Sequence, residues 1–281
     1  MISQTQEITK KILMNNKVGR EILGFVASIY SIFKFRKFCL IFYNKAWIHQ
    51  HRHGTVVDSI INFQASSDLE SSSSESWFHV YKPKFGDIII DVGAGIGTDT
   101  LLFSKMVGPS GKVIAVEAHP KTFISLSQMC KYNKLSNVVL CNCAITDKKM
   151  DVFIDDSNTH HISNTILGQS KGFKVDGLTL DDLLNKCNIG HIDFLKMNIE
   201  GAEKLAIKGM QKTVKKTRCL AIACHDFISK REGLHTMKTK DTIVSFLRKN
   251  GFEVILREKD RRDWVRDHVH GRICEKVLVG K

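Results

Sequence analysis

The sequence predicts an α/β fold in which a doubly wound, mostly parallel seven-stranded sheet carries helices on both faces. Three observations lead to this prediction. Short apolar runs alternate with amphipathic segments from residue 87 onward, a pattern typical of parallel sheets. Two of the runs end in an acidic residue, Asp91 and Glu117. A turn that contains Gly93, Gly95 and Gly97 follows the first run.

The alternation sets the order of the expected elements. We expect the last two strands to form an antiparallel hairpin, joined by the charged run 258–272. An insertion without helical pattern, residues 146–175, is a natural place for substrate contacts. It contains Asp155, Asp156, His160 and His161, although a plain surface hairpin would explain each of them equally well. The expected strands are 87–92, 112–117, 137–142, 192–198, 217–223, 252–257 and 273–279, and the expected helices are 97–106, 120–133, 179–186, 202–210 and 238–250.

The turn after residue 92 indicates a nucleoside cofactor. Glycines let backbone N–H groups approach a ligand closely. The spacing Gly-x-Gly-x-Gly differs from the dinucleotide fingerprint, because position 98 is Thr. Asp91 would repel a pyrophosphate but suits an ammonium group, which favours S-adenosylmethionine (SAM) over NAD. Glu117, at the end of the next strand, can accept hydrogen bonds from both ribose hydroxyls.

The chain resembles the FkbM-type family of SAM-dependent, class I methyltransferases. The last resembling segment reads Lys-Met-Asn-Ile-Glu-Gly-Ala-Glu, close to the family pattern Lys-Ile-Asp-x-Glu-Gly-x-Glu. Asn198 stands at the aspartate position, which puts a role for a carboxylate there in question. The resemblance covers roughly residues 78–281 and implies a Rossmann-like methyltransferase domain. The segments that carry it are 86–87, 91–97, 116–120, 178–183 and 196–203.

The resemblance implies that the cofactor lies over the carboxyl ends of the strands. On this basis the glycine-rich turn holds the methionine end, the acid after the second strand holds the ribose, and the segment after the third strand flanks the adenine. Asn198 and Glu200 would then lie between the cofactor and the acceptor. The full set of expected cofactor-binding residues is Asp91, Gly93, Ala94, Gly95, Gly97, Glu117, Ala118, Cys143, Ala144 and Asn198.

Two residues are candidates for catalysis. An oxygen nucleophile needs a base that takes its proton, and a histidine has an ordinary pKa near 6.5. His225, after the strand 217–223, is therefore the first choice, with a structural histidine bonded to backbone as the alternative. Glu200 could act as a base, accept a substrate hydrogen bond, or cap the helix that follows. A Mg²⁺ site at Asn198, Glu200 and Asp226 is a less favoured alternative, and no metal is expected.

The eight cysteines are scattered and form no Cys-x-x-Cys pair. Several lie in apolar runs, as free buried thiols do. We therefore expect a reducing, cytoplasmic location without structural zinc.

The composition predicts three regions. Residues 1–63 form a basic, apolar helical extension, residues 64–77 a serine-rich linker, and residues 78–281 the methyltransferase domain. Residues 1–56 hold nine Lys and Arg against Glu7 and Glu21. The apolar run 22–33 is shorter than the about 20 residues that span a bilayer. Residues 20–43 either lie on the inner face of a membrane as an amphipathic anchor or, as we favour, cap the domain or a second subunit.

Three alternating histidines, His49, His51 and His53, could share one face of a strand and bind metal. The favoured interpretation is a solvated loop.

The sequence favours methyl transfer to a hydroxyl of a small molecule or glycan. The formal net charge of +13 suggests a nucleic-acid methyltransferase instead. Residues 198–201, however, lack the Asn/Asp-Pro-Pro-aromatic motif of many base-methylating enzymes. A non-catalytic scaffold would not need Asp91, Gly93, Gly95 and Glu117, and an NAD dehydrogenase is disfavoured by the glycine spacing. Self-association into a homo-oligomer stays open.

Overall fold

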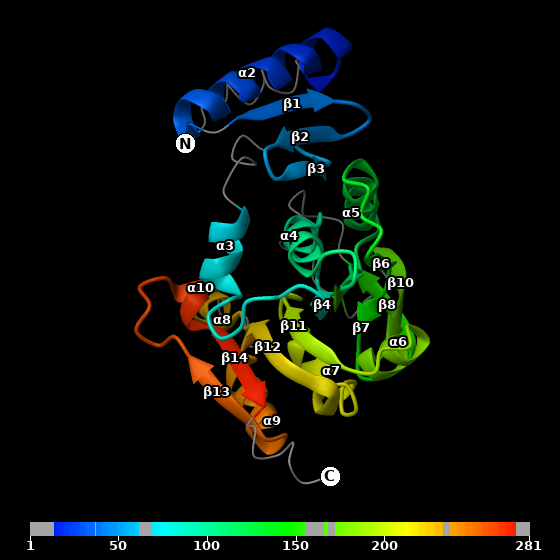
Figure 1. The fold of residues 1–281 in the computed structure, drawn as a ribbon, viewed down its shortest axis with the longest axis vertical. Helices are drawn as coiled ribbons and strands as arrows, with labels where there is room; N and C mark the ends of the chain where they lie inside the picture. The colour runs from blue at the N-terminus through cyan, green and yellow to red at the C-terminus, as the bar shows by residue number, and fades with distance from the viewer. Residues whose placement is uncertain are drawn as a thin grey trace.

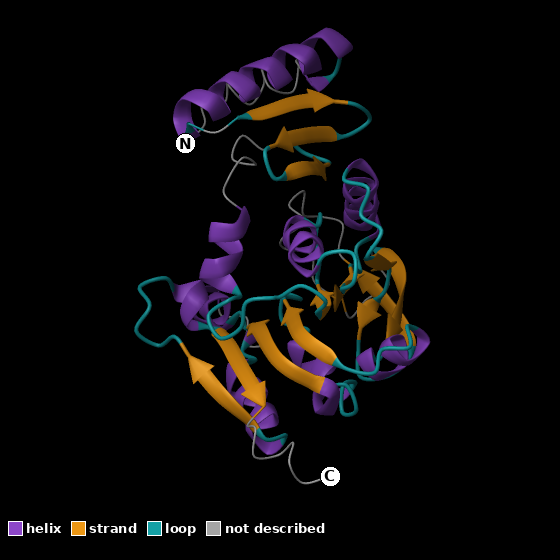
Figure 2. Ribbon diagram, viewed as in Figure 1, coloured by secondary structure: helices purple, strands orange, loops and turns teal. Residues whose placement is uncertain are grey.

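A seven-stranded sheet with helices on both faces forms the centre of the molecule (Figures 1 and 2). The computed structural model describes residues 14–36, 38–61, 69–154, 166–167, 172–232 and 237–273. The strands lie in the order β13-β14-β12-β11-β4-β5-β6. Their bounds are β4 Ile88–Val92, β5 Lys112–Val116, β6 Val138–Cys141, β11 Ile192–Met197, β12 Thr217–Ala223, β13 Phe252–Leu256 and β14 His268–Ile273.

Five neighbouring strands of this sheet, β12-β11-β4-β5-β6, run parallel, and β14 is antiparallel to both β12 and β13. Successive residues of one strand enter different cores. Ile89 packs with Phe103 and Phe194 on one face, and Ile90 packs with Leu180 and other residues on the other. Both faces are therefore covered, which confirms the doubly wound, mostly parallel fold. The helices are α4 Thr98–Val107, α5 Pro120–Tyr132, α6 Leu180–Lys186, α7 Glu203–Lys208, α8 Asp226–Glu232, α9 Lys240–Lys249 and α10 Asp263–Arg266.

The C-terminal hairpin is antiparallel, as expected, but its second strand lies earlier in the sequence than predicted. The strand is β14, His268–Ile273, whereas residues 274–279 of the predicted strand lie outside the described residues. The charged run 258–272 is therefore not simply a connection. His268 and His270 hid this strand from a hydropathy pattern, yet both are buried.

The insertion after β6 forms a four-stranded sheet in the order β7-β10-β8-β9. The expectation of an insertion without helices is correct for its described residues. Asp155, Asp156, His160 and His161 lie outside the described residues. The strands are β7 Ala144–Ile145, β8 Met150–Ile154, β9 Ile166–Leu167 and β10 Phe173–Leu178.

The N-terminal region is not wholly helical. It contains helix α2, Lys17–Phe35, and an antiparallel sheet of three strands in the order β1-β2-β3. None of the described helices is long and apolar enough to cross a membrane. The predicted helical extension is thus wrong for the three strands, whose β-branched and aromatic residues suit a sheet. These strands are β1 Cys39–Tyr43, β2 Trp47–His51 and β3 Gly54–Asp58.

This sheet packs on the catalytic domain through β3 and α5. The Asn133 side chain accepts a hydrogen bond from the Thr55 N–H at 2.9 Å and donates to the Thr55 carbonyl at 2.6 Å. Ile48 and Val56 share a core with Leu126 of α5. The N-terminal sheet is therefore held on the domain by apolar packing and by paired polar groups.

The solvated-loop interpretation of the three histidines is wrong for two of them. His49 and His51 lie on β2 and are buried. Burial is the main cause that lowers the pKa of each to about 4. Both rings are therefore neutral at pH 7.

The predicted linker also contains structure. Residues Leu69–Ser76 form helix α3, next to the catalytic domain (Figure 1). The Ser73 hydroxyl and the Trp77 indole both donate to Asp99, at 2.6 and 3.0 Å. The serine-rich composition concealed this helix because its contacts are polar and distant in sequence.

Candidate active site

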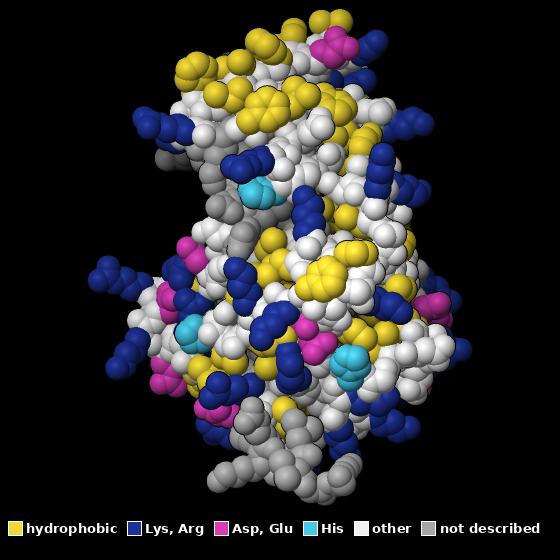
Figure 3. All heavy atoms as spheres, in the orientation of Figure 1, with side chains coloured by type: hydrophobic (Ala, Val, Ile, Leu, Met, Phe, Trp, Pro, Cys, Tyr) yellow, Lys and Arg dark blue, Asp and Glu magenta, His cyan; other side chains and the backbone are white. Residues whose placement is uncertain are grey.

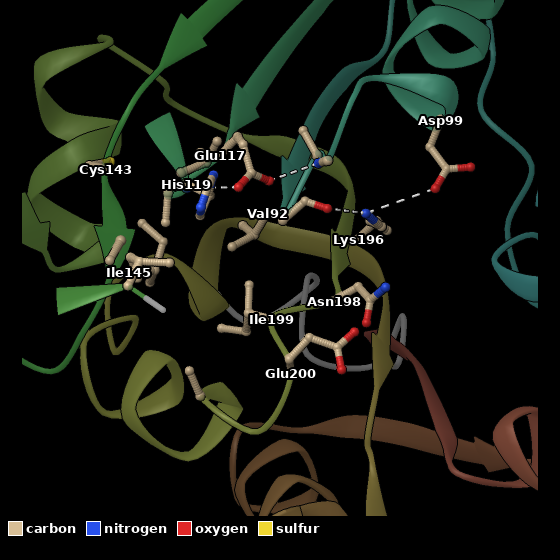
Figure 4. Close-up of a pocket in the computed structure, with 18 of the residues that line it drawn as sticks. Val92, Asp99, Glu117, His119, Cys143, Ile145, Lys196, Asn198, Ile199 and Glu200 are labelled. Carbon is tan, nitrogen blue, oxygen red and sulfur yellow. Dashed lines mark hydrogen bonds and ion pairs between the residues drawn. The ribbon is translucent and has the colours of Figure 1, made fainter. Parts of the chain in front are cut away.

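A cavity of about 280 Å³ opens at the carboxyl ends of β4, β5 and β11. Here β4 lies between β5 and β11, so the chain order changes direction, and ligands bind at such points in open α/β sheets. Figure 4 shows the residues that surround this first cavity, with Cys143 near one end and Asn198 and Glu200 near the other. Its volume is near the lower end of small-molecule sites, about 300–1,000 Å³.

The glycine-rich turn forms one wall of the first cavity. Gly93, Gly95 and Gly97 have φ of 74°, 58° and 93°, a region that favours glycine. At Gly93 an added Cβ would collide with the carbonyl oxygen of Asn198. The turn therefore needs glycine both for its backbone conformation and for its close approach to the segment after β11.

Glu117 closes this turn onto the end of β5. Its Oε2 accepts from the Gly95 N–H and its Oε1 from the His119 N–H, both at 2.8 Å (Figure 4). Burial raises the pKa of the Glu117 carboxyl, against the lowering effect of these two bonds. Each oxygen keeps a lone pair for a further donor, which fits the predicted contact with ribose hydroxyls.

A buried ion pair lies beneath the turn. The Lys196 ammonium is 2.9 Å from Asp91 Oδ1 and donates to the Gly93 carbonyl at 2.7 Å. The Thr100 hydroxyl donates to Asp91 Oδ2 at 2.6 Å. Burial lowers the pKa of Lys196, but Asp91 and Asp99 raise it more, so it lies above its ordinary value.

This pair corrects the role predicted for Asp91. Its side chain is fully buried and does not line the first cavity. The ammonium group that it meets belongs to Lys196. A lysine within an apolar strand was the sequence signal for such a partner, because buried lysines are paired.

Asp99 is a cavity-lining carboxylate that the sequence reasoning missed. It lies in the first turn of α4, where negative charge is favoured by the helix dipole. Burial raises the pKa of its carboxyl, and the Lys196 ammonium, 3.9 Å away, opposes that effect. Asp99 therefore occupies the position at the cavity wall that was predicted for Asp91.

Most of the predicted cofactor residues do meet at the first cavity. Gly97 does not, because it packs on Leu126 and Met129. The predicted residues that line it are Gly93, Ala94, Gly95, Glu117, Ala118, Cys143, Ala144 and Asn198.

Asn198 supplies an open acceptor at this cavity. Its Oδ1 is buried and has no hydrogen-bond partner among the described residues. An unpaired buried acceptor is costly unless a ligand satisfies it. The Asn198 acceptor, the close glycine turn and the Glu117 carboxylate together fit a ligand with an amino group and a ribose, as SAM has.

A second cavity, of about 310 Å³, adjoins the first. Asn198 and Glu200 line both cavities. Glu200 has a φ of 50°, a strained conformation that is uncommon outside glycine and often found at functional sites. The other residues around the second cavity are Ser76, Trp77, Ala223, Cys224, His225, Phe227, Ile228, Trp264 and His268.

His225 lies between two carboxylates at this second cavity. Its Nε2 is 3.3 Å from Glu200 Oε1, and its Nδ1 is 3.5 Å from Glu203 Oε1. Burial lowers its pKa, but hydrogen bonds and charges from Glu200 and Glu203 outweigh burial and raise the pKa to about 10. A ring with this pKa is protonated at pH 7, which does not favour the base role predicted for His225.

His268 is the neutral histidine of the second cavity, and the sequence reasoning missed it. Its ring stacks on Trp77 with centroids 4.9 Å apart. Its Nδ1 lies 3.1 Å from the Ser76 carbonyl oxygen, which can only accept, so Nδ1 carries the proton. Burial lowers the pKa of His268 to about 4. Only the fold brings residues 76–77 and 268 together, so no local pattern could have shown this contact.

The structure ties Asp226, a candidate magnesium ligand, to backbone. Its Oδ1 accepts from the N–H groups of Thr239 and Lys240, at 2.7 and 3.0 Å. Within the described residues, no three His, Cys, Asp or Glu side chains are grouped as metal ligands.

Replacing Lys196 by methionine should destabilise the protein. Lys196→Met leaves Asp91 as a buried charge without a cation, which costs about 3–5 kcal/mol of unfolding free energy. Denaturant unfolding measures this loss. The double variant Asp91→Asn/Lys196→Met should recover part of it, and equal losses in both would contradict the ion-pair explanation.

Glu117→Gln should weaken SAM binding by roughly tenfold to a hundredfold, because an amide nitrogen cannot accept the bonds that a carboxylate oxygen accepts. Titration calorimetry measures the affinity. Glu253→Gln, on the distant strand β13, is the control, since Glu253 pairs with Arg272 and not with the cavity. Unchanged SAM affinity in Glu117→Gln would exclude Glu117 from the cofactor site.

Solved structures of methyltransferases are similar to this chain. An FkbM methyltransferase from Methylobacillus flagellatus KT has 17% identity and a TM-score of 0.49, with 70% of this chain and 47% of that chain covered. This chain thus spans about half the length of that protein. A SAM-dependent methyltransferase from Aquifex aeolicus has 16% identity and a TM-score of 0.43, covering 74% of this chain and 100% of that one. M. jannaschii TYW2 in complex with AdoMet has 16% identity and a TM-score of 0.43, with coverages of 82% and 86%.

The sequence itself matches a family. The model of the methyltransferase FkbM domain matches residues 91–254, more than half of the 281 residues. The match includes the glycine-rich turn, Glu117, Lys196 and Glu200. The chain belongs to the FkbM family of methyltransferases.

Proposed function

We propose that the protein transfers a methyl group from SAM to a hydroxyl oxygen of a small molecule or glycan. The observation that carries this proposal is that Asn198 and Glu200 border both cavities. A cofactor in the first cavity and an acceptor in the second would meet at these two residues. The close placement of two reactants accounts for much of the acceleration in such transfers.

The residues of the first cavity would hold SAM by its two polar ends. When bound, SAM supplies an electrophilic methyl group on a positively charged sulfur. Glu117 would accept the ribose hydroxyls, and Cys143 and Ala144 would flank the adenine. Asn198 Oδ1 and Asp99 are acceptors suited to the amino group, and the turn at Gly93 and Gly95 lets backbone approach the methionine end.

Glu200 is the group best placed to take the proton of an acceptor hydroxyl. It lines the second cavity as a carboxylate next to the His225 imidazolium. In this scheme the hydroxyl oxygen would form the new O–CH₃ bond as the S–CH₃ bond of SAM breaks, S-adenosylhomocysteine would leave, and the hydroxyl proton would pass to Glu200. His225 touches neither cofactor nor methyl group in this scheme and acts as a positioning residue, because its Nε2 contacts Glu200 while its Nδ1 faces Glu203.

The second cavity suits a neutral, hydroxyl-bearing ring. Its described lining contains no Lys or Arg, whereas nucleic-acid phosphates are bound chiefly by these residues. Phe227 and Trp264 offer apolar ring surfaces. The polar groups that line it include the acceptors Glu200 and Asn198, and acceptors select a ligand that donates.

Glu200→Gln should lower the rate of methyl transfer by about 10²–10⁴-fold, the usual contribution of a general base. The assay follows labelled methyl from SAM into a panel of glycosides and phenols. SAM affinity, measured by calorimetry, should stay within a few-fold of the original. Full activity in the Glu200→Gln variant would show that Glu200 is not the base.

His225 should contribute to stability in a pH-dependent way. Its pKa rises from 6.5 in the unfolded chain to about 10 in the folded protein, so its contribution is complete below pH 6.5 and lost as the pH rises towards 10. The difference in unfolding free energy between the protein and His225→Gln should therefore shrink over this range. A difference independent of pH would mean that the ring is neutral.

A further inference from the structure

Helix α2 turns its large apolar side chains outward. Val18, Ile22, Phe25 and Phe33 are 64%, 48%, 69% and 79% exposed. A surface helix normally places its large apolar residues against the core and polar residues outside. The orientation of α2 is the reverse, so its outer face needs a different explanation.

Small residues, together with Leu23, form the packed side of α2. Gly24, Ala27, Ser28 and Ser31 are buried, and a Cβ at Gly24 would collide with the carbonyl oxygen of Ile41 on β1. The Ser28 hydroxyl accepts from the Ile41 N–H at 2.8 Å, which satisfies a backbone donor of the edge strand. The inner face of α2 is thus packed on β1, and these contacts fix which side of the helix points outward.

The exposed apolar surface continues from the helix onto β1. Leu40, Phe42 and Tyr43 of β1 are exposed at 44%, 36% and 38%. Figure 3 shows this surface as apolar side chains over α2 and β1. Of the eighteen exposed large hydrophobic residues in the described chain, twelve belong to this surface, namely Val18, Ile22, Phe25, Val26, Ile29, Tyr30, Ile32, Phe33, Phe38, Leu40, Phe42 and Tyr43. Apolar surface gathered in this way marks an interaction site.

Positive charge surrounds this apolar surface. Lys17 and Arg20 lie near the start of α2, and Lys34 and Arg36 lie at its end. Glu21 is the acidic residue among the described residues 14–52. Basic side chains beside an exposed apolar helix face are typical of helices that lie in the interface of anionic membranes.

We propose that the outer surface of α2 and β1 docks on an anionic lipid membrane. The apolar side chains would enter the acyl boundary while the basic residues meet lipid headgroups. Two copies of the chain joined face to face through this surface would instead bring like charges together, which is unfavourable. The helix would lie along the membrane rather than through it, because its other face is packed on β1.

The docked surface would also orient the enzyme. The N-terminal sheet is tied to α5 by the Asn133–Thr55 hydrogen bonds and a shared core. A membrane bound by α2 would therefore hold the catalytic domain in a defined orientation relative to the lipid surface. This inference goes beyond the proposed methyl transfer and does not depend on it.

Flotation with vesicles tests the proposal on the full chain. We expect binding to vesicles of phosphatidylcholine with phosphatidylglycerol that is at least about tenfold stronger than to phosphatidylcholine alone, and weaker at high salt. The double variant Phe25→Ser/Phe33→Ser should bind roughly a hundredfold more weakly, because two exposed aromatic rings no longer enter the lipid. It should still bind SAM, which shows that it is folded.

Phe85→Ser is the matched control, because Phe85 is 70% exposed and lies outside this surface. It should bind vesicles as the unchanged chain does. No vesicle binding, or binding that Phe25→Ser/Phe33→Ser leaves intact, would overturn the proposal. So would a dimer seen by light scattering that the double variant dissociates, because a second copy would then cover the surface.

Discussion

The buried pair of Lys196 and Asp91 is the interaction on which the site depends. The two residues are direct partners in the register of β11 and β4, so their side chains meet on the same face of the sheet. Their side chains are 2% and 0% exposed, and neither charge could be buried alone at acceptable cost. Because the same ammonium also bonds the Gly93 carbonyl, the pair links two strands to the turn that forms the cavity wall.

The other charged residues of the site are also paired, either with an opposite charge or with hydrogen-bond donors. Glu117 satisfies backbone donors on both sides of the first cavity, and Glu200 and Glu203 hold a protonated His225. These contacts decide the role of each residue in the site, which the residue type alone does not. His225 is already protonated, so the proton acceptor in our scheme is its partner, Glu200. His268, stacked on Trp77, is the histidine that stays neutral.

The parallel sheet was predictable because each of its strands is apolar on both faces and is separated from the next by a helical pattern or a turn. The search for apolar runs failed where polar residues are buried. His49 and His51 lie in a buried strand, His268 and His270 lie in another, and Ser73 anchors a helix in a segment rich in serine. In each case a polar side chain is buried against partners far away in the chain, which hydropathy patterns do not register.

The sequence by itself determined the α/β class, the family and most of the residues that line the first cavity, because these depend on local spacing and on the alternation of strands and helices. Tertiary structure alone decided which charges meet. Asp91 and Lys196 are neighbours only because β4 and β11 pair, and Trp77 meets His268 only because the fold brings the residue after α3 against β14. Protonation states depend on such contacts, so the chemistry of the site followed from the fold and not from the order of residues.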